Sequence, residues 1–339
     1  DALPIYGQSA SVSSGGVLTV NQAINTSPGA GGSITVGNAV LNAALVAGAG
    51  SITLQGGGNN LVINAAQSSA TTLNYSARQD IIIGATVTTT DPAANINLTA
   101  DSDLNGTGGV QVLAAGQLNS AKNVSILGSD LVATGGGAAD SVRIDADGAN
   151  DQVLAVGDIT VSHNVAAAPA GAVVVLDGKV HSTNGNISLT AKSSVQAQSS
   201  LTADLGSIAV HSAFVLTGDE LLVAGNNVTF DTTVDGSSAG GQALTVNAAG
   251  ITTFTGTVGA TSIKSLTTDA AGSTRLNANV TTSTTQVYGD NLTLTNNVVL
   301  NGSSLTFAQK DDSASNATPR SLKVHRRGAG VNHFEGLVG

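Results

Sequence analysis

Short runs of alternating apolar and polar residues recur along the chain, and Gly, Asn or Asp introduces each of them. Typical runs are residues 32–36 (GSITV), 50–54 (GSITL), 157–161 (GDITV), 185–189 (GNISL) and 206–210 (GSIAV). A period of two indicates half-buried strands, and the introducing residues supply turns. No amphipathic segment of helical length separates the runs, which argues against strands joined by helices.

Two all-β architectures fit short strands of this kind. A β-sandwich repeat is the alternative, but its core uses large aromatic side chains and regular hairpin turns, and the chain has only three Tyr and five Phe. A parallel β-helix, also called a solenoid, stacks short strands and small corner residues from coil to coil. We therefore predict a right-handed parallel β-helix with about 20 residues per coil.

The alternation also predicts which side chains face the core of such a solenoid. Val228 and Leu292 should point inward and Thr229 outward, because successive strand residues face opposite sides. The Asn pairs at 59–60, 226–227 and 296–297 are either stacked amide ladders or simple turn residues.

A longer repeat is visible in the C-terminal half. Residues 228–230 (VTF) recur as residues 305–307 (LTF), 77 positions later, and Phe254 recurs as Phe334. This predicts a shaft with irregular coils over residues 1–225, one repeat unit of about 78 residues over 226–302, and the start of a second unit with a basic segment over 303–339. The partial last unit suggests a longer parent protein.

Composition and charge exclude several classes of function. The chain has no Cys, so it can form no disulfide framework, cysteine-ligated zinc site or thiol nucleophile. Its net charge of −10 argues against a nucleic-acid partner. The longest apolar stretch, near residues 165–176, is interrupted by Pro169 and is too short to cross a membrane. We therefore expect no transmembrane segment.

The Gly-(Asn/Asp/Ser)-Ile-(Thr/Ser)-(Val/Leu) phrases, with the segments 242–256 and 265–272, resemble the repeats of filamentous-haemagglutinin-like bacterial surface and secreted proteins. The resemblance covers most of residues 30–307, although the secretion domain typical of that family is not recognisable in residues 1–50. It implies a secreted or cell-surface bacterial protein that is not an enzyme and serves as an adhesive or structural segment. Its expected partners are other copies of itself, in head-to-tail or lateral assembly, or host and cell-surface glycans or proteins.

One segment suggests a metal site. Asp101, Asp103 and Asn105, followed by Gly106, have the alternating oxygen ligands of a calcium loop. The closing Glu is missing, because Val112 stands at the twelfth position. The alternative is a polar turn between strands. Calcium is thus the one cofactor that the sequence suggests.

Two further acidic segments are also candidates for binding calcium or other divalent cations. Residues 135–142 form a single copy of the glycine-rich calcium-binding nonapeptide, which normally needs neighbouring copies. Six Asp lie between Asp130 and Asp158, either as a weak collector of divalent cations or as a solvated acidic face.

Other candidate residues carry competing interpretations. A carbohydrate-active β-helix enzyme, a lyase or hydrolase, would need grouped carboxylates or a base, yet the seven basic residues before position 310 are scattered.

Threonine pairs at 252–253, 267–268 and 281–282 could form an ice-binding ladder, or simply face solvent. His163 and His181 could share a metal, although exposed positions are the simpler interpretation. Residues 310–339, with net charge +2, could contact an acidic shaft head to tail.

Overall fold

The computed structural model describes residues 10–12, 18–25, 34–37, 39–47, 52–56, 60–131, 140–163, 168–313, 319–328 and 330–335. Contacts between Cα atoms divide the chain into two compact units. The first unit comprises Asp1–Gly185 and Thr190–Ser193, and the second comprises Asn186–Leu189 and Ser194–Gly339. The described residues contain no helix, and their strands belong to three sheets, called A, B and C here.

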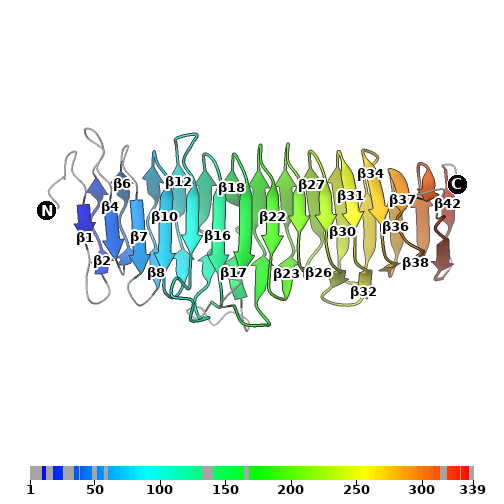
Figure 1. Ribbon diagram of the computed structural model, residues 1–339, viewed down its shortest axis with the longest axis horizontal. Helices are drawn as coiled ribbons and strands as arrows, with labels where there is room; N and C mark the ends of the chain where they lie inside the picture. The colour runs from blue at the N-terminus through cyan, green and yellow to red at the C-terminus, as the bar shows by residue number, and fades with distance from the viewer. Residues whose placement is uncertain are drawn as a thin grey trace. The chain divides into compact units, whose positions relative to one another are not determined.

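The first unit holds strands β1 to β21, which run from blue to green in Figure 1. Its sheet A contains β1 (Ala10–Val12), β4 (Ile34–Gly37), β7 (Ile52–Gly56), β10 (Leu73–Ala77), β13 (Ile96–Thr99), β16 (Val124–Gly128) and β19 (Ile159–His163). Its sheet B contains β2 (Leu18–Val20), β5 (Ala39–Leu41), β8 (Leu61–Ile63), β11 (Ile81–Ile83), β14 (Val110–Val112), β17 (Asp140–Ile144) and β20 (Val173–Leu176). Its sheet C contains β3 (Ile24–Asn25), β6 (Leu45–Ala47), β9 (Gln67–Ser69), β12 (Thr86–Thr89), β15 (Gln117–Ser120), β18 (Asp151–Ala155) and β21 (Lys179–Ser182).

The second unit repeats this arrangement from β22 onward. Its sheet A contains β22 (Ile187–Thr190), β25 (Ile208–Val210), β28 (Val228–Phe230), β31 (Ile251–Phe254), β34 (Ser273–Leu276), β37 (Asn291–Leu294) and β40 (Asp311–Ser313). Its sheet B contains β23 (Ser194–Ala197), β26 (Ala213–Leu216), β29 (Val234–Gly236), β32 (Val258–Ile263), β35 (Val280–Thr282), β38 (Val298–Gly302) and β41 (Leu322–Arg326). Its sheet C contains β24 (Ser200–Ala203), β27 (Glu220–Ala224), β30 (Ala243–Ala248), β33 (Ser265–Thr268), β36 (Thr285–Tyr288), β39 (Ser304–Phe307) and β42 (Asn332–Phe334).

Each coil consists of one strand from each sheet, and within each unit every strand pairs in parallel with the strand three positions later. In the second unit, Ile208 of β25 pairs with Val228 of β28, 20 residues on, and Phe254 of β31 pairs with Leu276 of β34, 22 residues on. The predicted parallel β-helix is therefore confirmed. The alternative, a β-sandwich, is excluded, because the sheets of a β-sandwich are antiparallel.

Coils in the first unit vary more in length because their turns vary. Ile34 pairs with Ile52, 18 residues on, whereas Val124 pairs with Ile159, 35 residues on. The extra residues lie in turns, such as 101–109 between β13 and β14 and 145–150 between β17 and β18. Turn residues can be added because the strands on either side keep their register.

The core is a set of columns of equivalent inward side chains. In sheet A of the second unit, Val210, Phe230, Phe254 and Leu276 follow one another on paired strands, and all are at most 1% exposed. The rings of Phe230 and Phe254 stack with centroids 5.0 Å apart and planes 8° from parallel. The predicted inward positions of Val228 and Leu292 are confirmed, since these residues are 0% and 1% exposed.

Asn and Asp side chains at the corners hold successive coils together. In the first unit Asn95 Oδ1 accepts the Asn123 N–H, and Asn123 Oδ1 accepts the Asp158 N–H. In the second unit Asn227 Oδ1 accepts the Ile251 N–H, and Asn297 Oδ1 accepts the Ser321 N–H. These bonds satisfy backbone donors where the strand ladder is interrupted.

The Asn pairs named from sequence therefore act mainly as corner acceptors, and Asn59 lies outside the described residues. An amide ladder does occur in the first unit, at positions not predicted from the sequence. Asn64 Nδ2 donates to Asn42 Oδ1 at 3.0 Å, and Asn42 Nδ2 donates to Asn21 Oδ1 at 2.9 Å.

The two copies of the 78-residue sequence repeat lie on different sheets. Residues 228–230 belong to β28 of sheet A, and their match, residues 305–307, belongs to β39 of sheet C. Phe254 likewise lies in sheet A and Phe334 in sheet C. Phe230 and Phe307 are at most 2% exposed, and Phe334, which is 44% exposed, stacks on Phe307. The repeat therefore preserves the side of the strand on which a side chain lies but not the sheet that carries it.

The strand phase can be tested with two adjacent substitutions in β28. We expect Val228→Asp to destabilise the second unit by about 3 kcal/mol or more, because it buries a charge without a partner. Thr229→Asp, on the outward side, should change the stability by less than about 1 kcal/mol. Thermal unfolding followed by circular dichroism measures both, and the reverse order of effects would contradict the assigned phase.

Candidate functional site

The predicted calcium segment forms a tight turn that is organised around Asp101. The Asp101 side chain is buried, and its Oδ1 accepts the N–H of Asn105 at 2.8 Å. Its carboxylate also accepts the Gly106 N–H and the Ser129 hydroxyl. Asp101 and Leu104 both have positive φ angles, of 52° and 59°. This conformation is uncommon outside glycine, and the Asp101 contacts stabilise it.

Asp103 and Asn105 lie on the exposed side of the same turn. Asn105 Nδ2 donates to Asp103 Oδ2 at 3.2 Å, and Asn105 Oδ1 accepts the Thr107 N–H at 2.8 Å. Within the part of the chain that the structure describes, no three His, Asp or Glu side chains are grouped so that they could hold a metal ion. The calcium site at Asp101, Asp103 and Asn105 stays a prediction. Residues 135–139 of the nonapeptide lie outside the described residues.

Part of the acidic stretch from Asp130 to Asp158 surrounds Arg143 of β17. The guanidinium donates to Asp145 at 2.8 Å, to Asp177 at 2.9 Å and to Asp140 at 3.4 Å. Gln111 of β14 donates to the other oxygen of Asp145. Burial raises the pKa of Asp140 above its ordinary value, and the hydrogen bond and charge of Arg143 offset only part of this rise. Two of the six Asp of the predicted acidic face, Asp140 and Asp145, are therefore tied into one network with Arg143 and Asp177.

The histidines considered as metal ligands do not share a site. His163 is 7% exposed, with Nδ1 3.4 Å from the Thr190 carbonyl oxygen. The expectation that it is exposed is therefore wrong. His181 instead pairs with Asp151, its Nδ1 lying 2.9 Å from the carboxylate.

The threonine pairs considered for an ice-binding ladder do not lie on one face. Thr253 belongs to sheet A, Thr267 to sheet C and Thr281 to sheet B. Their neighbours Thr252, Thr268 and Thr282 are buried. These three pairs therefore form no common ladder, because the intervals between them advance the chain from one sheet to another.

The basic segment after residue 309 is partly engaged within the chain. Lys310 contacts Asp312, and Arg326 donates to the Gly330 carbonyl oxygen. Lys323 and His325 lie on β41, beside Val299 and Asn301 of β38. Head-to-tail contact through this segment stays a prediction.

Among the described residues of the second unit, two acidic side chains are buried, and neither was a candidate from the sequence. Glu220, the first residue of β27, is 3% exposed, and its Oε2 accepts the Ser199 N–H at 2.6 Å. The other carboxylate oxygen, Oε1, has no hydrogen-bond partner, and burial raises the pKa of Glu220 to about 8. Asp290 accepts the hydroxyls of Thr268 and Thr274, and burial raises its pKa to about 6.

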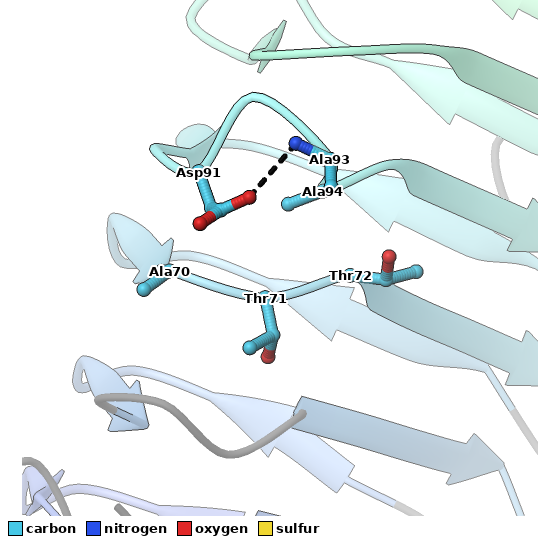
Figure 2. A pocket seen from close by; sticks show the side chains of 6 residues that line it. All are labelled: Ala70, Thr71, Thr72, Asp91, Ala93 and Ala94. Atoms are coloured by element: carbon cyan, nitrogen blue, oxygen red, sulfur yellow. Dashed lines mark hydrogen bonds between the residues drawn. The ribbon is translucent and has the colours of Figure 1, made fainter.

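A small open pocket lies at a corner of the first unit. It has a volume of about 260 Å³ and lies between the corner that joins β9 to β10 and the corner that joins β12 to β13. Figure 2 shows the residues that line it, which are Ala70, Thr71, Thr72, Asp91, Ala93 and Ala94. Asp91 Oδ1 accepts the Ala93 N–H at 2.8 Å, and Thr72 Oγ1 accepts the Asn95 N–H at 3.1 Å.

The pocket adjoins an outer face without ionic side chains. Strands β4, β7, β10, β13, β16 and β19 of sheet A contain no Asp, Glu, Lys or Arg. Their paired outward positions form one row of hydroxyl and amide side chains, namely Thr35, Thr53, Asn74, Asn97, Ser125 and Thr160. Asn97 Nδ2 donates to Asn74 Oδ1 at 2.8 Å, directly beyond the pocket.

Comparisons of the chain with protein-family models, curated proteins and solved structures find no match. Across the described residues there is no long apolar helix that could cross a membrane. The fold class, a parallel β-solenoid, is the classification that the structure supports.

The role of Asp101 in the turn can be measured directly. Asp101→Ala should destabilise the first unit by about 1–3 kcal/mol, because buried donors lose their acceptor. Asp103→Ala, on the exposed side of the turn, is the control and should have a much smaller effect. An equal loss of stability in both variants would contradict the role assigned to Asp101.

The predicted calcium site is tested by calorimetry of the unmodified chain with Ca²⁺. If Ca²⁺ produces neither heat of binding nor a change in Tm, the chain has no calcium site.

The buried Glu220 predicts a pH-dependent stability. Because its folded pKa is about 8, against an ordinary value of 4.5, the folded state holds a proton that the unfolded state releases. Its contribution should be fully present below pH 4.5 and be lost as the pH rises through 8, a change of the order of 4 kcal/mol. Glu220→Gln should remove this part of the slope in Tm between pH 4.5 and 9. Glu335→Gln, at an exposed position, is the control, and equal slopes in wild type and Glu220→Gln would contradict the prediction.

Proposed function

We propose that the chain is a non-catalytic structural and adhesive segment of a long extracellular repeat protein, secreted by or displayed on a bacterial cell. The observation that carries the proposal is the parallel stacking of coils within each unit. Such coils extend a protein by repetition, since each one is stabilised by its neighbours. The family resemblance of the glycine-led strand phrases supports the same role.

The side-chain chemistry supports a structural role as well. The largest fully buried side chains are aliphatic or aromatic, and the corner Asn side chains accept backbone N–H groups from adjacent coils. Around Arg143, three carboxylates bind the guanidinium of the same unit. These polar side chains stabilise the solenoid itself.

The proposal predicts that the chain is accessible on intact cells. Antibodies against the full chain should label cells that carry the native gene, and mild protease treatment should remove the label. Cells without the gene should show lower adhesion to surfaces. Labelling that appears only after lysis would contradict the proposal.

The alternative function, that of a carbohydrate-active enzyme, is tested by a separate assay. The purified chain is incubated with neutral and uronate polysaccharides, and new reducing or unsaturated ends are measured. We expect none, and their appearance would assign a lyase or hydrolase activity instead.

A further inference from the structure

We propose that the corner pocket of the first unit and the adjoining face of sheet A bind a neutral glycan. One sugar ring would occupy the pocket, and the rest of the chain would extend over the outward residues of β10 and β13. This partner class rests on the adhesive role proposed above.

The size and lining of the pocket fit one sugar ring. Its volume of about 260 Å³ is just below the range of about 300–1,000 Å³ that is usual for drug-sized ligands. Asp91 supplies a carboxylate, which accepts hydrogen bonds from hydroxyl groups. The methyl groups of Ala70 and Ala93 supply apolar surface for the C–H groups of a ring.

The pocket is held open by bonds within its own corners. The Asp91–Ala93 bond fixes the upper corner in Figure 2, and the bond from the Asn95 N–H to Thr72 ties the upper corner to the lower one. Thr72 uses its oxygen as an acceptor in that bond, so its hydroxyl hydrogen can still be donated. A preformed site of this kind loses little free energy to ordering when it binds.

The pocket and the neighbouring surface select against anionic ligands. The outward side chains that follow the pocket, Asn74 and Asn97, are uncharged, as is every other member of the row from Thr35 to Thr160. An acidic glycan would meet the Asp91 carboxylate and a chain of net charge −10. Hydroxyl and amide groups repeated on strands about 4.8 Å apart can bond to the hydroxyls of an extended neutral chain.

The test uses the full chain with an array of neutral and uronate glycans, followed by titration with maltohexaose, cellohexaose and an oligogalacturonate. We expect neutral glycans to bind and the oligogalacturonate not to bind. Asp91→Asn keeps an acceptor for the Ala93 N–H but removes the charge, and should weaken binding about tenfold. Ala93→Trp should fill the pocket and abolish binding.

Asp219→Asn is the matched control, because Asp219 is an exposed corner residue of the second unit that accepts the Ala243 N–H at 2.8 Å. It should leave glycan binding unchanged. No binding of any neutral glycan, a preference for the uronate, or equal binding by wild type and both pocket variants would each overturn the inference. Labelling of intact cells does not depend on these results, so the display role and the glycan site can fail separately.

Discussion

Backbone hydrogen bonds between parallel strands of successive coils are the interaction on which the rest of this structure depends. They require each strand to lie directly beside its equivalent, and they leave N–H groups unpaired wherever a corner interrupts the ladder. Buried or half-buried donors of this kind are costly unless they find an acceptor. Asn95, Asn123 and Asn227 supply such acceptors, each to a residue of the next coil. The abundance of Asn and Asp before the strands follows from this need.

The same stacking restricts where charge can be placed. A charged residue at an outward strand position would lie near the equivalent position of both neighbouring coils, and like charges there repel one another. The chain has only 10% charged residues, and in the first unit sheet A has none on the strands from β4 to β19. Where sheet B does carry Arg143, three carboxylates surround it. The stacking thus favours a neutral, hydrogen-bonding face, and such a face is also the surface beside the pocket.

Much of the fold could be predicted from the sequence, because the alternation within one strand is a local property. The inward positions of Val228 and Leu292 depend only on their own strands, and both were predicted correctly. The sheet that carries a residue depends instead on the length of every turn before it. Thr253, Thr267 and Thr281 therefore lie on three sheets although their spacing suggested one ladder.

The pocket could not be predicted for the same reason. It forms between two corners about one coil apart in the chain, Ala70–Thr72 and Asp91–Ala94, and their approach depends on the register between β10 and β13. Glu220 did leave a signal in the sequence. It opens the otherwise apolar strand 220–224, and the period of two places it on the same side as the buried Leu222.

The long repeat shows which property of the chain is retained between copies. From β28 to β39, and from β31 to β42, the repeat advances by eleven strands. Eleven is not a multiple of three, so a copied side chain keeps its inward or outward direction but moves to another sheet. Phe254 and Phe334 fit this rule, as do Phe230 and Phe307. Contacts between neighbouring coils are reproduced by such a repeat, as the stacked pairs Phe230–Phe254 and Phe307–Phe334 show, but they move to another face. Repetition in this part of the chain therefore preserves the packing between successive coils, but it does not keep successive copies of a surface on one face. The corner pocket, at residues 70–94 of the first unit, lies outside this repeat.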